Sequence, residues 1–296
     1  MKIDELLKKK ATISFEIFPP KNQDGNIDSI YRTIDELSHL NPDFISVTYG
    51  AGGSSKGKTV EIASKIKNEY HIEAVAHLSC ITSTKEEIKT ICKELQDNHI
   101  ENILSLRGDY PADPEFKRAE QPDFMYASDL SQYIHEEFGD AFCLSGACYP
   151  EVHQEADSFE RDLENLVKKV EAGAKYLITQ IFFDNHYYYR LVKEIRKRGI
   201  EVPVLAGIMP VTNAKGLLHT AKLCGCNIPY DLSTMIERYR DNPKAMREIG
   251  VQYATMQILD LITNGVDGIH IYTMNKPRIA KSIFEAIPEV LKGMNP

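Results

Sequence analysis

The sequence predicts an α/β fold, a (β/α)₈ TIM barrel in which eight parallel strands alternate with helices. Three observations lead to this prediction: β-type runs recur eight times along the 296 residues, helical patterns separate them, and no linker divides the chain. Strict alternation of strand and helix indicates a parallel sheet, and eight units in a chain of this length favour a closed barrel over an open sheet. We therefore expect a single barrel domain over residues 1–296.

Eight short apolar segments have the composition of buried strands. Most are rich in β-branched or aromatic residues, and most end in polar residues or a turn signal. We expect the strands at residues 12–18, 44–49, 73–80, 102–109, 141–149, 176–183, 202–209 and 268–274.

The segments between these strands carry apolar residues at helical spacing. The clearest helical patterns lie at residues 27–40, 84–99, 158–173 and 187–199. Ser83 and Glu86 form a capping-box signature at the start of the second of these helices. The interval between the seventh and eighth strands is twice the usual length, and it is expected to hold extra helices at residues 213–225, 229–242 and 243–265.

Composition and charge exclude two classes of partner. The formal net charge is −8 and no basic stripe is present to neutralise phosphates, which argues against a nucleic-acid partner. No apolar run approaches the roughly 18–20 residues that span a bilayer, so no membrane association is expected. Residues 1–10 are charged and lack the apolar core of a secretory signal, which predicts a cytoplasmic protein.

The six cysteines are scattered, and most lie in apolar segments. This distribution predicts reduced core thiols rather than a disulfide framework. Cys224 and Cys226 are the one close pair in the sequence. No matching Cys/His pair stands at ligand spacing elsewhere, so no metal site is predicted.

Residues 52–59 read GGSSKGKT and match the phosphate-binding loop of nucleotide triphosphatases. Such a loop needs to follow the first strand of an open sheet, and a second strand must end in an acidic magnesium ligand. Here the glycines follow the second predicted strand, and the best candidate for the acidic strand is interrupted by Arg107 and Gly108. We therefore interpret the segment as the second loop of the barrel rim, with Lys56 and Lys58 in solvent.

Polar side chains gather where the predicted strands end, which is the edge at which barrel enzymes place their chemistry. They are Glu16, Thr48, Tyr49, His77, Arg107, Gly108, Asp109, Tyr149, Pro150, Glu151, Gln180, Tyr272 and Thr273. Taken alone, a histidine such as His77 is more often a hydrogen-bonded core residue than a catalyst, and Arg107 with Asp109 could form a structural ion pair. No nucleophile elbow, HExxH metal motif or helix-opening G-x-G-x-x-G is present, and this favours chemistry borrowed from an organic cofactor.

The same segments resemble the methylenetetrahydrofolate reductase family. The motifs that carry the resemblance are SFEIFPPK at 14–21, SVTYGAGG at 46–53, HLSC at 77–80, LSLRGDYP at 104–111, MYASDL at 125–130, YPEVHQEA at 149–156, AGAKYLITQIFFD at 172–184, GIMPV at 207–211 and IYTMN at 271–275. They run in order from about residue 12 to residue 290, at matching spacing. The chain is similar to the short bacterial form, without the regulatory region of the eukaryotic enzymes.

The resemblance implies an FAD-dependent oxidoreductase of one-carbon metabolism, active as a homo-oligomer. NADH or NADPH would reduce the flavin and leave, and methylenetetrahydrofolate would take the vacated place to become 5-methyltetrahydrofolate. Glu16 would be the general acid that opens the folate's five-membered ring. Asp109 would act near the flavin and the pterin, and Gln180 would contact nicotinamide and folate in turn.

The resemblance also assigns binding roles. The positions that match FAD-binding residues are Thr48, His77, Arg107, Gly108, Asp109, Ala127, Tyr149, His153, Ala156, Asp162, Asn165, Lys168 and Lys169. The positions that match substrate-binding residues are Glu16, Thr48, Asp109, Gln180, Tyr272 and Lys276. Two positions depart from the family pattern: Lys276 stands where an arginine is common, and Gly216 where a glutamine is common.

Simple physical chemistry agrees with these assignments. Arg107, Lys168 and Lys169 suit the FAD pyrophosphate, and Asp162, Asn165 and Lys169 share one helix face. A carboxylic acid that donates near neutral pH needs an apolar pocket, and Phe15, Ile17 and Phe18 are the sequence neighbours of Glu16.

Two other functions stay open at this point. The chain could be a flavin- or folate-binding subunit that needs a partner for electron input. It could also be another FAD-dependent barrel dehydrogenase, such as one that oxidises proline.

Overall fold

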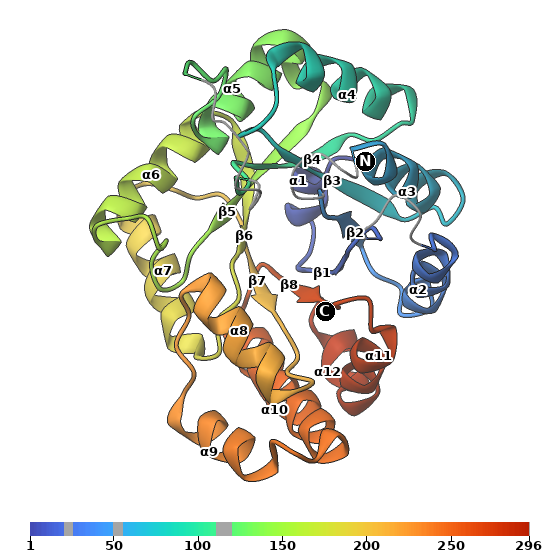
Figure 1. Ribbon diagram of the computed structural model, residues 1–296, viewed down its shortest axis with the longest axis vertical. Coiled ribbons are helices and arrows are strands. Elements are labelled where there is room, and N and C mark those ends of the chain that lie inside the picture. The colour runs from blue at the N-terminus through green and yellow to red at the C-terminus, as the bar shows by residue number, and fades with distance from the viewer. Residues whose placement is uncertain (21–25, 50–55, 111–119, 296) are drawn as a thin grey trace.

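Eight parallel strands close into a barrel, as the sequence predicts, and helices surround it (Figure 1). The computed structural model describes residues 1–20, 26–49, 56–110 and 120–295. Each strand pairs with its neighbours in sequence, and β1 pairs with β8 to close the sheet. The strands are β1 (Thr12–Ile17), β2 (Phe44–Val47), β3 (Glu73–Ser79), β4 (Asn102–Leu106), β5 (Cys143–Cys148), β6 (Ala174–Thr179), β7 (Val204–Ile208) and β8 (Gly268–Tyr272).

Every strand ends earlier than the sequence pattern suggests. The difference is largest at β4 and β6, where Arg107 and Gln180 lie just beyond the strand rather than inside it. Just after β6 the Gln180 side-chain oxygen accepts a hydrogen bond from the amide of Ile181, at 2.9 Å. Arg107 and Gln180 therefore stand in loops at the carboxyl edge of the barrel, whereas Glu16, His77 and Tyr272 lie in the last residues of their strands.

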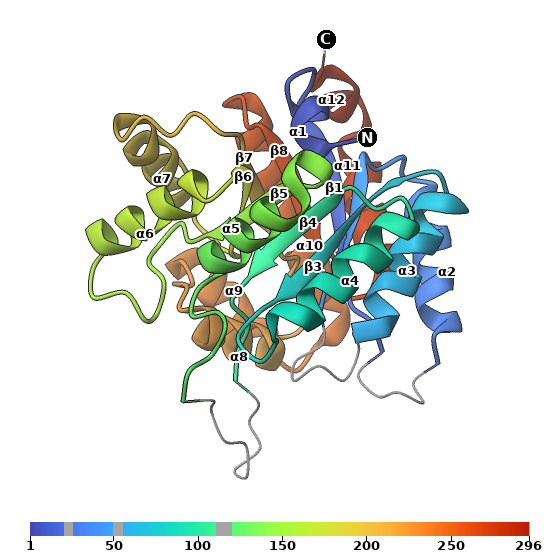
Figure 2. The same ribbon diagram turned by 90° about the horizontal axis from the view of Figure 1, so that it is seen from above.

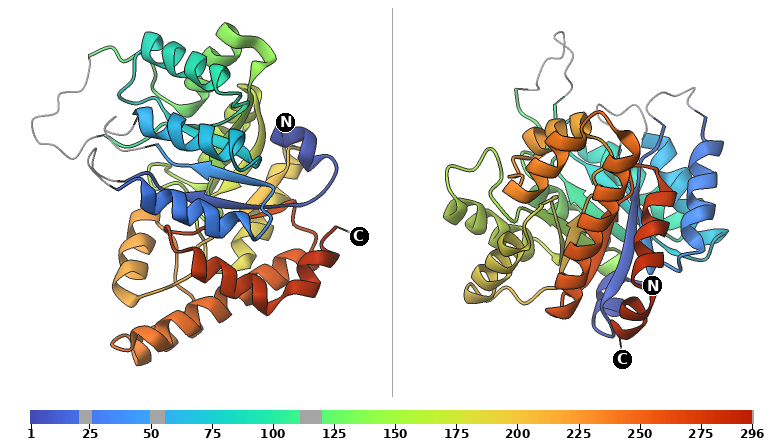
Figure 3. Two further views of the ribbon diagram at one scale, coloured as in Figure 1. Left: turned by 90° about the vertical axis from the view of Figure 1, so that its right-hand side faces the viewer. Right: turned by 90° about the horizontal axis from the view of Figure 1, so that it is seen from below.

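Helices follow the strands around the outside of the barrel. They are α2 (Asp28–Ser38), α3 (Lys56–Asn68), α4 (Lys85–Asp97), α5 (Ala127–Phe138), α6 (Phe159–Glu171), α7 (Asn185–Lys197), α8 (Ala214–Cys224), α9 (Tyr230–Tyr239), α10 (Pro243–Thr263), α11 (Pro277–Ala286) and α12 (Pro288–Gly293), with a short 3₁₀ helix η2 (Gly139–Ala141) before β5. The three extra helices predicted between the last two strands are α8, α9 and α10. Figure 3 shows α10 running beside α11.

The capping box of α4 lies one residue later than predicted. Thr84, not Ser83, is the N-cap: its hydroxyl accepts from the amide of Glu87, and the Glu87 carboxylate accepts from the amide of Thr84. The Ser83 hydroxyl instead donates to the carbonyl of Ser79, at 3.2 Å. Ser83 with Glu86 and Thr84 with Glu87 both fit the capping-box pattern. Ser83 does not cap the helix because its hydroxyl is hydrogen-bonded to the end of β3.

A short helix that the sequence pattern did not indicate, α1 (Ile3–Leu7), closes the amino end of the barrel. Ile3 is fully buried in a cluster with inward-facing residues such as Phe44 and Tyr176. Its amide donates to the side-chain oxygen of Asn102, at 2.9 Å. Figure 2 shows α1 at one end of the barrel, while α8 lies toward the other. The interior is thus plugged at one end, and the opposite end remains for a site.

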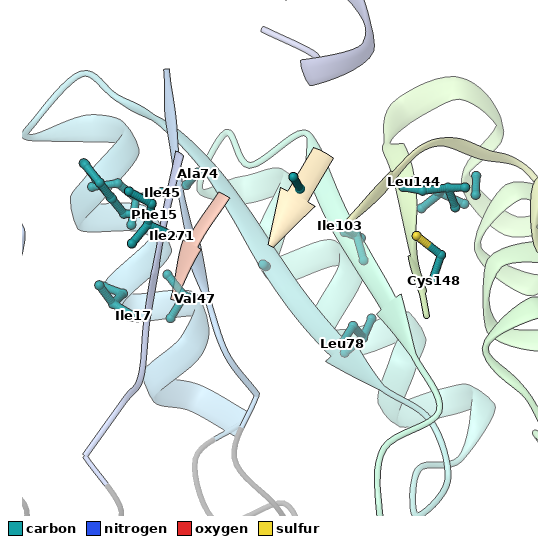
Figure 4. Close-up of a cluster of buried hydrophobic side chains, with 14 of the residues drawn as sticks. Phe15, Ile17, Ile45, Val47, Ala74, Leu78, Ile103, Leu144, Cys148 and Ile271 are labelled. Atoms are coloured by element: carbon teal, nitrogen blue, oxygen red, sulfur yellow. The ribbon is translucent and has the colours of Figure 1, made fainter. Parts of the chain in front are cut away.

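The larger hydrophobic cluster fills the space between the sheet and the helices (Figure 4). Phe15 and Ile17 belong to this outer cluster, and Phe15 packs against Phe284 of α11 with ring centroids 5.5 Å apart. Because successive residues of a strand point to opposite faces, Glu16 faces the barrel interior instead. The expectation that Phe15 and Ile17 surround the Glu16 carboxyl is therefore wrong.

The glycine-rich segment at residues 52–59 lies largely outside the described residues. What is described is its setting: it follows β2 of a closed barrel and leads into α3. In the described parts of the chain, no helix is long and apolar enough to cross a membrane.

Candidate active site at the carboxyl ends of the strands

Glu16 lies at the centre of the candidate site. It is the next-to-last residue of β1, it faces the barrel interior, and only 6% of its surface is exposed. Its Oε2 atom lies 3.4 Å from Nε2 of His77 on β3 and 3.5 Å from Nε2 of His270 on β8. We call Glu16, His77, His270 and Tyr272 the Glu16 pocket.

His77 is a buried histidine with an unused nitrogen. It is 5% exposed, and burial lowers its pKa to about 4, so the ring is uncharged at neutral pH. Among the described residues its Nε2 has no hydrogen-bond partner, although the Glu16 Oε2 atom lies 3.4 Å away. Leaving a buried polar atom unpaired costs free energy, and such atoms mark positions that a ligand completes. His77 is thus a buried core histidine. Its Nε2 atom is not hydrogen-bonded, in contrast to the hydrogen-bonded core histidine that the sequence also allowed.

His270 was not among the residues singled out from the sequence. It is fully buried in the barrel and stacks on Phe44, with ring centroids 5.9 Å apart. Its Nδ1 lies 2.7 Å from the Ser14 hydroxyl, and its Nε2 faces Glu16 and the Ser46 hydroxyl. The period-two pattern of a strand could have found it, because His270 precedes Tyr272 by two residues and points to the same face.

Tyr272 forms one wall of the Glu16 pocket. Its hydroxyl donates to the carbonyl of Thr179 on β6, at 2.6 Å, and burial raises its pKa. To reach β6 the ring crosses Gly207 of β7, where an added Cβ would lie 2.6 Å from the ring and 2.3 Å from the Thr179 oxygen. The tyrosine hydroxyl is therefore occupied within the protein, and the ring is the part that remains to contact a substrate.

A second group of predicted residues lies at the ends of β4 and β5 and on α6. We call its cations Arg107, Lys168 and Lys169 the cationic rim. Arg107 makes a two-point ion pair with Glu155, one contact being 2.8 Å. The alternative pairing of Arg107 with Asp109 is wrong, because Glu155 occupies the guanidinium and Asp109 is exposed.

Gly108 determines the backbone turn beside Arg107, and Lys169 is the rim cation that lies against the end of β5. Gly108 has φ of +82°, and a Cβ there would meet the Ser79 hydroxyl at 2.1 Å, so the turn requires glycine. The Lys169 ammonium donates to the carbonyl of Ala147, at 2.7 Å, and lies 5.8 Å from the centre of the Tyr149 ring. Burial lowers the pKa of Lys169.

Of the three residues predicted to share one face of α6, Asp162 and Lys169 line a small pocket with Cys148 and Tyr149, whereas the side-chain oxygen of Asn165 contacts Lys168. The Asp162 carboxylate accepts from the amide of His153, at 2.8 Å, and the His153 ring packs edge-on against Tyr149. Lys168 points to the exposed side of the helix, 3.4 Å from the Asn165 side-chain oxygen.

The other predicted residues lie around the same edge of the barrel. Thr48 follows β2 and its amide donates to the carbonyl of Ile17, at 3.0 Å. Gln180 follows β6 and is half-buried. Ala127 begins α5, and Ala156 lies in the loop before α6. Lys276 is exposed and its ammonium donates to the Thr212 hydroxyl, at 2.8 Å, which places it toward β7 rather than in the Glu16 pocket.

Two further features lie near α8. Gly216 stands in its first turn, where its amide donates to the side chain of the N-cap Asn213. Cys224 and Cys226 follow as half-buried free thiols, and burial raises their pKa values to about 11 and about 12. The other four cysteines are buried free thiols. Among the residues that the structure describes, no three His, Cys, Asp or Glu side chains are grouped so as to hold a metal ion.

The described residues fit an FAD molecule. The cationic rim offers charge-assisted donors for a pyrophosphate. His77 offers a buried nitrogen that lacks a partner, and Gly108 lets the backbone turn tightly between the two groups. A dinucleotide with an anionic centre and a polar ring system would satisfy these positions together.

Comparison with known proteins agrees with the motifs. The family model described as methylenetetrahydrofolate reductase matches residues 2–288. The 5,10-methylenetetrahydrofolate reductase of Escherichia coli is 38% identical over 274 residues, covering 93% of this chain and 90% of that protein. The Arabidopsis thaliana protein named methylenetetrahydrofolate reductase (NADH) 1 is 36% identical over 93% of this chain. The chain spans about half the length of that relative, 48%.

Solved structures share the fold. An uncharacterised Clostridium thermocellum protein that binds two copies of 5-methyl-5,6,7,8-tetrahydrofolic acid superposes with a TM-score of 0.67. It is 16% identical, and the match covers 98% of this chain and 99% of that one. At this level of identity the likeness shows the barrel alone.

Proposed function

Because the chain belongs to the methylenetetrahydrofolate reductase family, we propose that it reduces 5,10-methylenetetrahydrofolate to 5-methyltetrahydrofolate, with FAD as cofactor and NADH or NADPH as reductant. The observation that carries the proposal is a buried carboxyl, Glu16, placed inside the barrel mouth beside two histidines. The relatives from E. coli and Pectobacterium carotovorum carry this activity in their names, and the match covers 90% of the length of each.

Glu16 is the acid of the proposed reaction. The folate substrate is a closed five-membered ring, and protonation of one ring nitrogen opens it toward an iminium ion that can accept a hydride. Of the two histidines beside the carboxyl, His77 is uncharged at neutral pH, so it does not supply a cation that would hold Glu16 as an ion pair. Glu16 is only 6% exposed, and this burial keeps bulk water from competing for its proton.

The FAD-binding residues are the cationic rim together with the residues that connect it to the Glu16 pocket. Arg107, Lys168 and Lys169 hold the pyrophosphate, and His77 with Thr48 holds the ring system. When bound, FAD carries a hydride from the nicotinamide to the one-carbon unit of the folate. Arg107 must exchange its Glu155 contact for the phosphate, and the exposure of that ion pair makes the exchange inexpensive.

Substrate contacts come from residues that face the same opening. Gln180 contacts nicotinamide and folate in turn, Asp109 contacts the pterin, and the Tyr272 ring forms the wall. The Lys276 ammonium lies further out, where it suits the negatively charged glutamate tail of folate. The name of the Arabidopsis relative contains NADH, and this supports NADH as the first donor to test.

Anaerobic spectroscopy of the purified protein tests the proposal. The protein should be yellow, and NADH or NADPH should bleach it. One equivalent of methylenetetrahydrofolate per flavin should then restore the colour. A colourless protein that fails to take up FAD would overturn the cofactor assignment. Bleaching by proline would select the proline-type dehydrogenase. A flavin that neither NADH nor NADPH reduces unless a partner protein is added would select the partner-dependent subunit.

A further inference from the structure

The segment that follows β8 holds the main chain of Glu16. The Thr273 hydroxyl donates to the carbonyl of Glu16 at 2.6 Å, and the Thr273 amide donates to the same oxygen at 3.3 Å. Thr273 is 4% exposed, so this bond is shielded from water. A carbonyl held by two donors has little freedom to rotate, and the Cα that carries the Glu16 side chain is fixed with it.

Asn275 holds the main chain on the other side. Its side-chain amide donates to the carbonyl of Phe18 at 2.8 Å, and its side-chain oxygen accepts from the amide of Phe18 at 2.9 Å. These two bonds imitate the ladder of a β-sheet at a point where the regular pairing of β1 with β8 has ended. The amide of Asn275 in turn donates to the Thr273 hydroxyl, at 3.2 Å, which links the two contacts.

The backbone of this segment is strained. Met274 and Asn275 have φ values of +51° and +55°. Asparagine tolerates this left-handed region, but methionine adopts it rarely. Strain of this kind persists only where surrounding contacts impose it, and it gathers at functional sites. Here the imposed geometry brings the Thr273 and Asn275 side chains against the main chain of Glu16, in β1, and of Phe18, just after it.

We infer that Thr273 and Asn275 are positioning residues for Glu16. They fix the main chain from Glu16 to Phe18, and so fix the direction in which the carboxyl presents its proton. Among the residues that the structure describes, the side-chain ion-pair contacts of the carboxyl are with the two histidines, at 3.4 Å and 3.5 Å, so its placement depends on the backbone. The inference rests on the proposed function, because positioning matters only if Glu16 donates a proton.

Thr273→Val is the first test, because valine keeps the shape and removes the donor. The folate half-reaction should slow about 10- to 100-fold, as expected for a misplaced catalytic group, while reduction of the flavin by NADH should stay within about twofold. Thr273→Ser restores the hydroxyl and should recover most of the rate. The matched control is Thr255→Val, since Thr255 is also 4% exposed and its hydroxyl donates to a carbonyl at 2.7 Å, within α10.

Asn275→Gly is the second variant. Glycine accepts the left-handed backbone freely, so any effect reports the lost side-chain amide rather than strain. The same selective slowing of the folate half-reaction is expected. This variant also keeps the test decisive if Thr273→Val does not fold.

A double-mutant comparison decides whether these residues act through Glu16. In a Glu16→Gln background, Thr273→Val should cause no further slowing of the folate half-reaction, because the group that it positions is gone. Equal slowing in both backgrounds, or equal slowing of both half-reactions, would overturn the inference. A wild-type protein that does not reduce the folate would overturn the proposed function, whereas a normal wild type with an equally fast Thr273→Val variant would overturn the inference alone.

Discussion

The Glu16 pocket and the cationic rim lie on the same edge of the barrel but are built differently. In the pocket, Glu16, His77 and His270 are each at most 6% exposed, and the segment that follows β8 holds the main chain around Glu16. On the rim, Arg107 is 28% exposed and its partner Glu155 is 62% exposed. The pocket residues are buried, whereas on the rim the ion pair between Arg107 and Glu155 is exposed.

The difference fits the roles that we propose for the two regions. A proton donor works only within a narrow range of distance and angle, so its surroundings must be fixed before substrate arrives. A side chain that binds a diffusing dinucleotide must instead keep its charge solvated while the ligand is absent. An exposed ion pair does this at little cost, because such pairs are worth at most about 1 kcal/mol. Substitutions should therefore damage the pocket through packing and the rim through affinity.

The packing of the pocket is tested most severely at Gly207. Gly207→Ala places a methyl group against the Thr179 carbonyl and the Tyr272 ring, and we expect it to lower the free energy of unfolding by about 3 kcal/mol. The matched control is Gly146→Ala in β5, where the new methyl meets its neighbours at 3.5 Å or more. Chemical denaturation measures both. Equal stability of the two variants would mean that the Tyr272 ring can shift to make room for the methyl group at little cost.

The charge of the rim is tested by Arg107→Met. Loss of a charge-assisted contact to an anion should weaken FAD binding about 10- to 100-fold, with the unfolding free energy nearly unchanged. Fluorescence titration of the apoprotein with FAD measures the affinity. Arg161→Met is the control, because Arg161 is also ion-paired on the surface, with Glu164 of the same helix. If both variants bind FAD normally, Arg107 has no part in the cofactor site.

The rigid pocket should also make the protein sensitive to acid. The pKa of His77 is about 4 in the folded protein against 6.5 for an ordinary histidine, so the unfolded chain binds the proton more tightly. The stability that comes from a neutral His77 is complete above pH 6.5 and is lost as the pH falls toward 4. Between pH 7 and pH 5 this amounts to roughly 2 kcal/mol. His77→Gln should show a correspondingly smaller loss, and an identical pH dependence in both proteins would contradict the pKa assignment.

The smallest effect is expected from Glu155→Gln. The substitution removes the charge that competes for Arg107, so FAD affinity should rise a few-fold. Stability should change by less than about 1 kcal/mol, because the ion pair is exposed. A fall in FAD affinity would show that Glu155 orients Arg107 for the cofactor instead of competing with it.

The sequence was sufficient to predict the barrel and the edge that carries the polar residues. Alternation of strand and helix is a strong pattern, and parallel strands bring their carboxyl ends together whatever the loops do. Glu16 and His77, which are 61 residues apart in the chain, are therefore neighbours as expected.

The sequence was not sufficient where loop geometry or side-chain direction decides the contact. The partner of Arg107 is Glu155, from a loop 48 residues later, rather than the adjacent Asp109. The surroundings of Glu16 are histidines from other strands, because the pleat turns its apolar neighbours outward. The contacts of Thr273 and Asn275 depend on a left-handed turn at Met274 that no sequence pattern marks.

In the proposed reaction Glu16 supplies the proton for folate reduction and takes no part in flavin reduction. Glu16→Gln keeps the shape of the side chain and removes the acid, so the two half-reactions should separate. We predict that NADH oxidation with an artificial electron acceptor continues at nearly the wild-type rate, while reduction of methylenetetrahydrofolate falls about 10²- to 10⁴-fold. Equal loss of both half-reactions would contradict the account and leave Glu16 as a structural residue of the barrel.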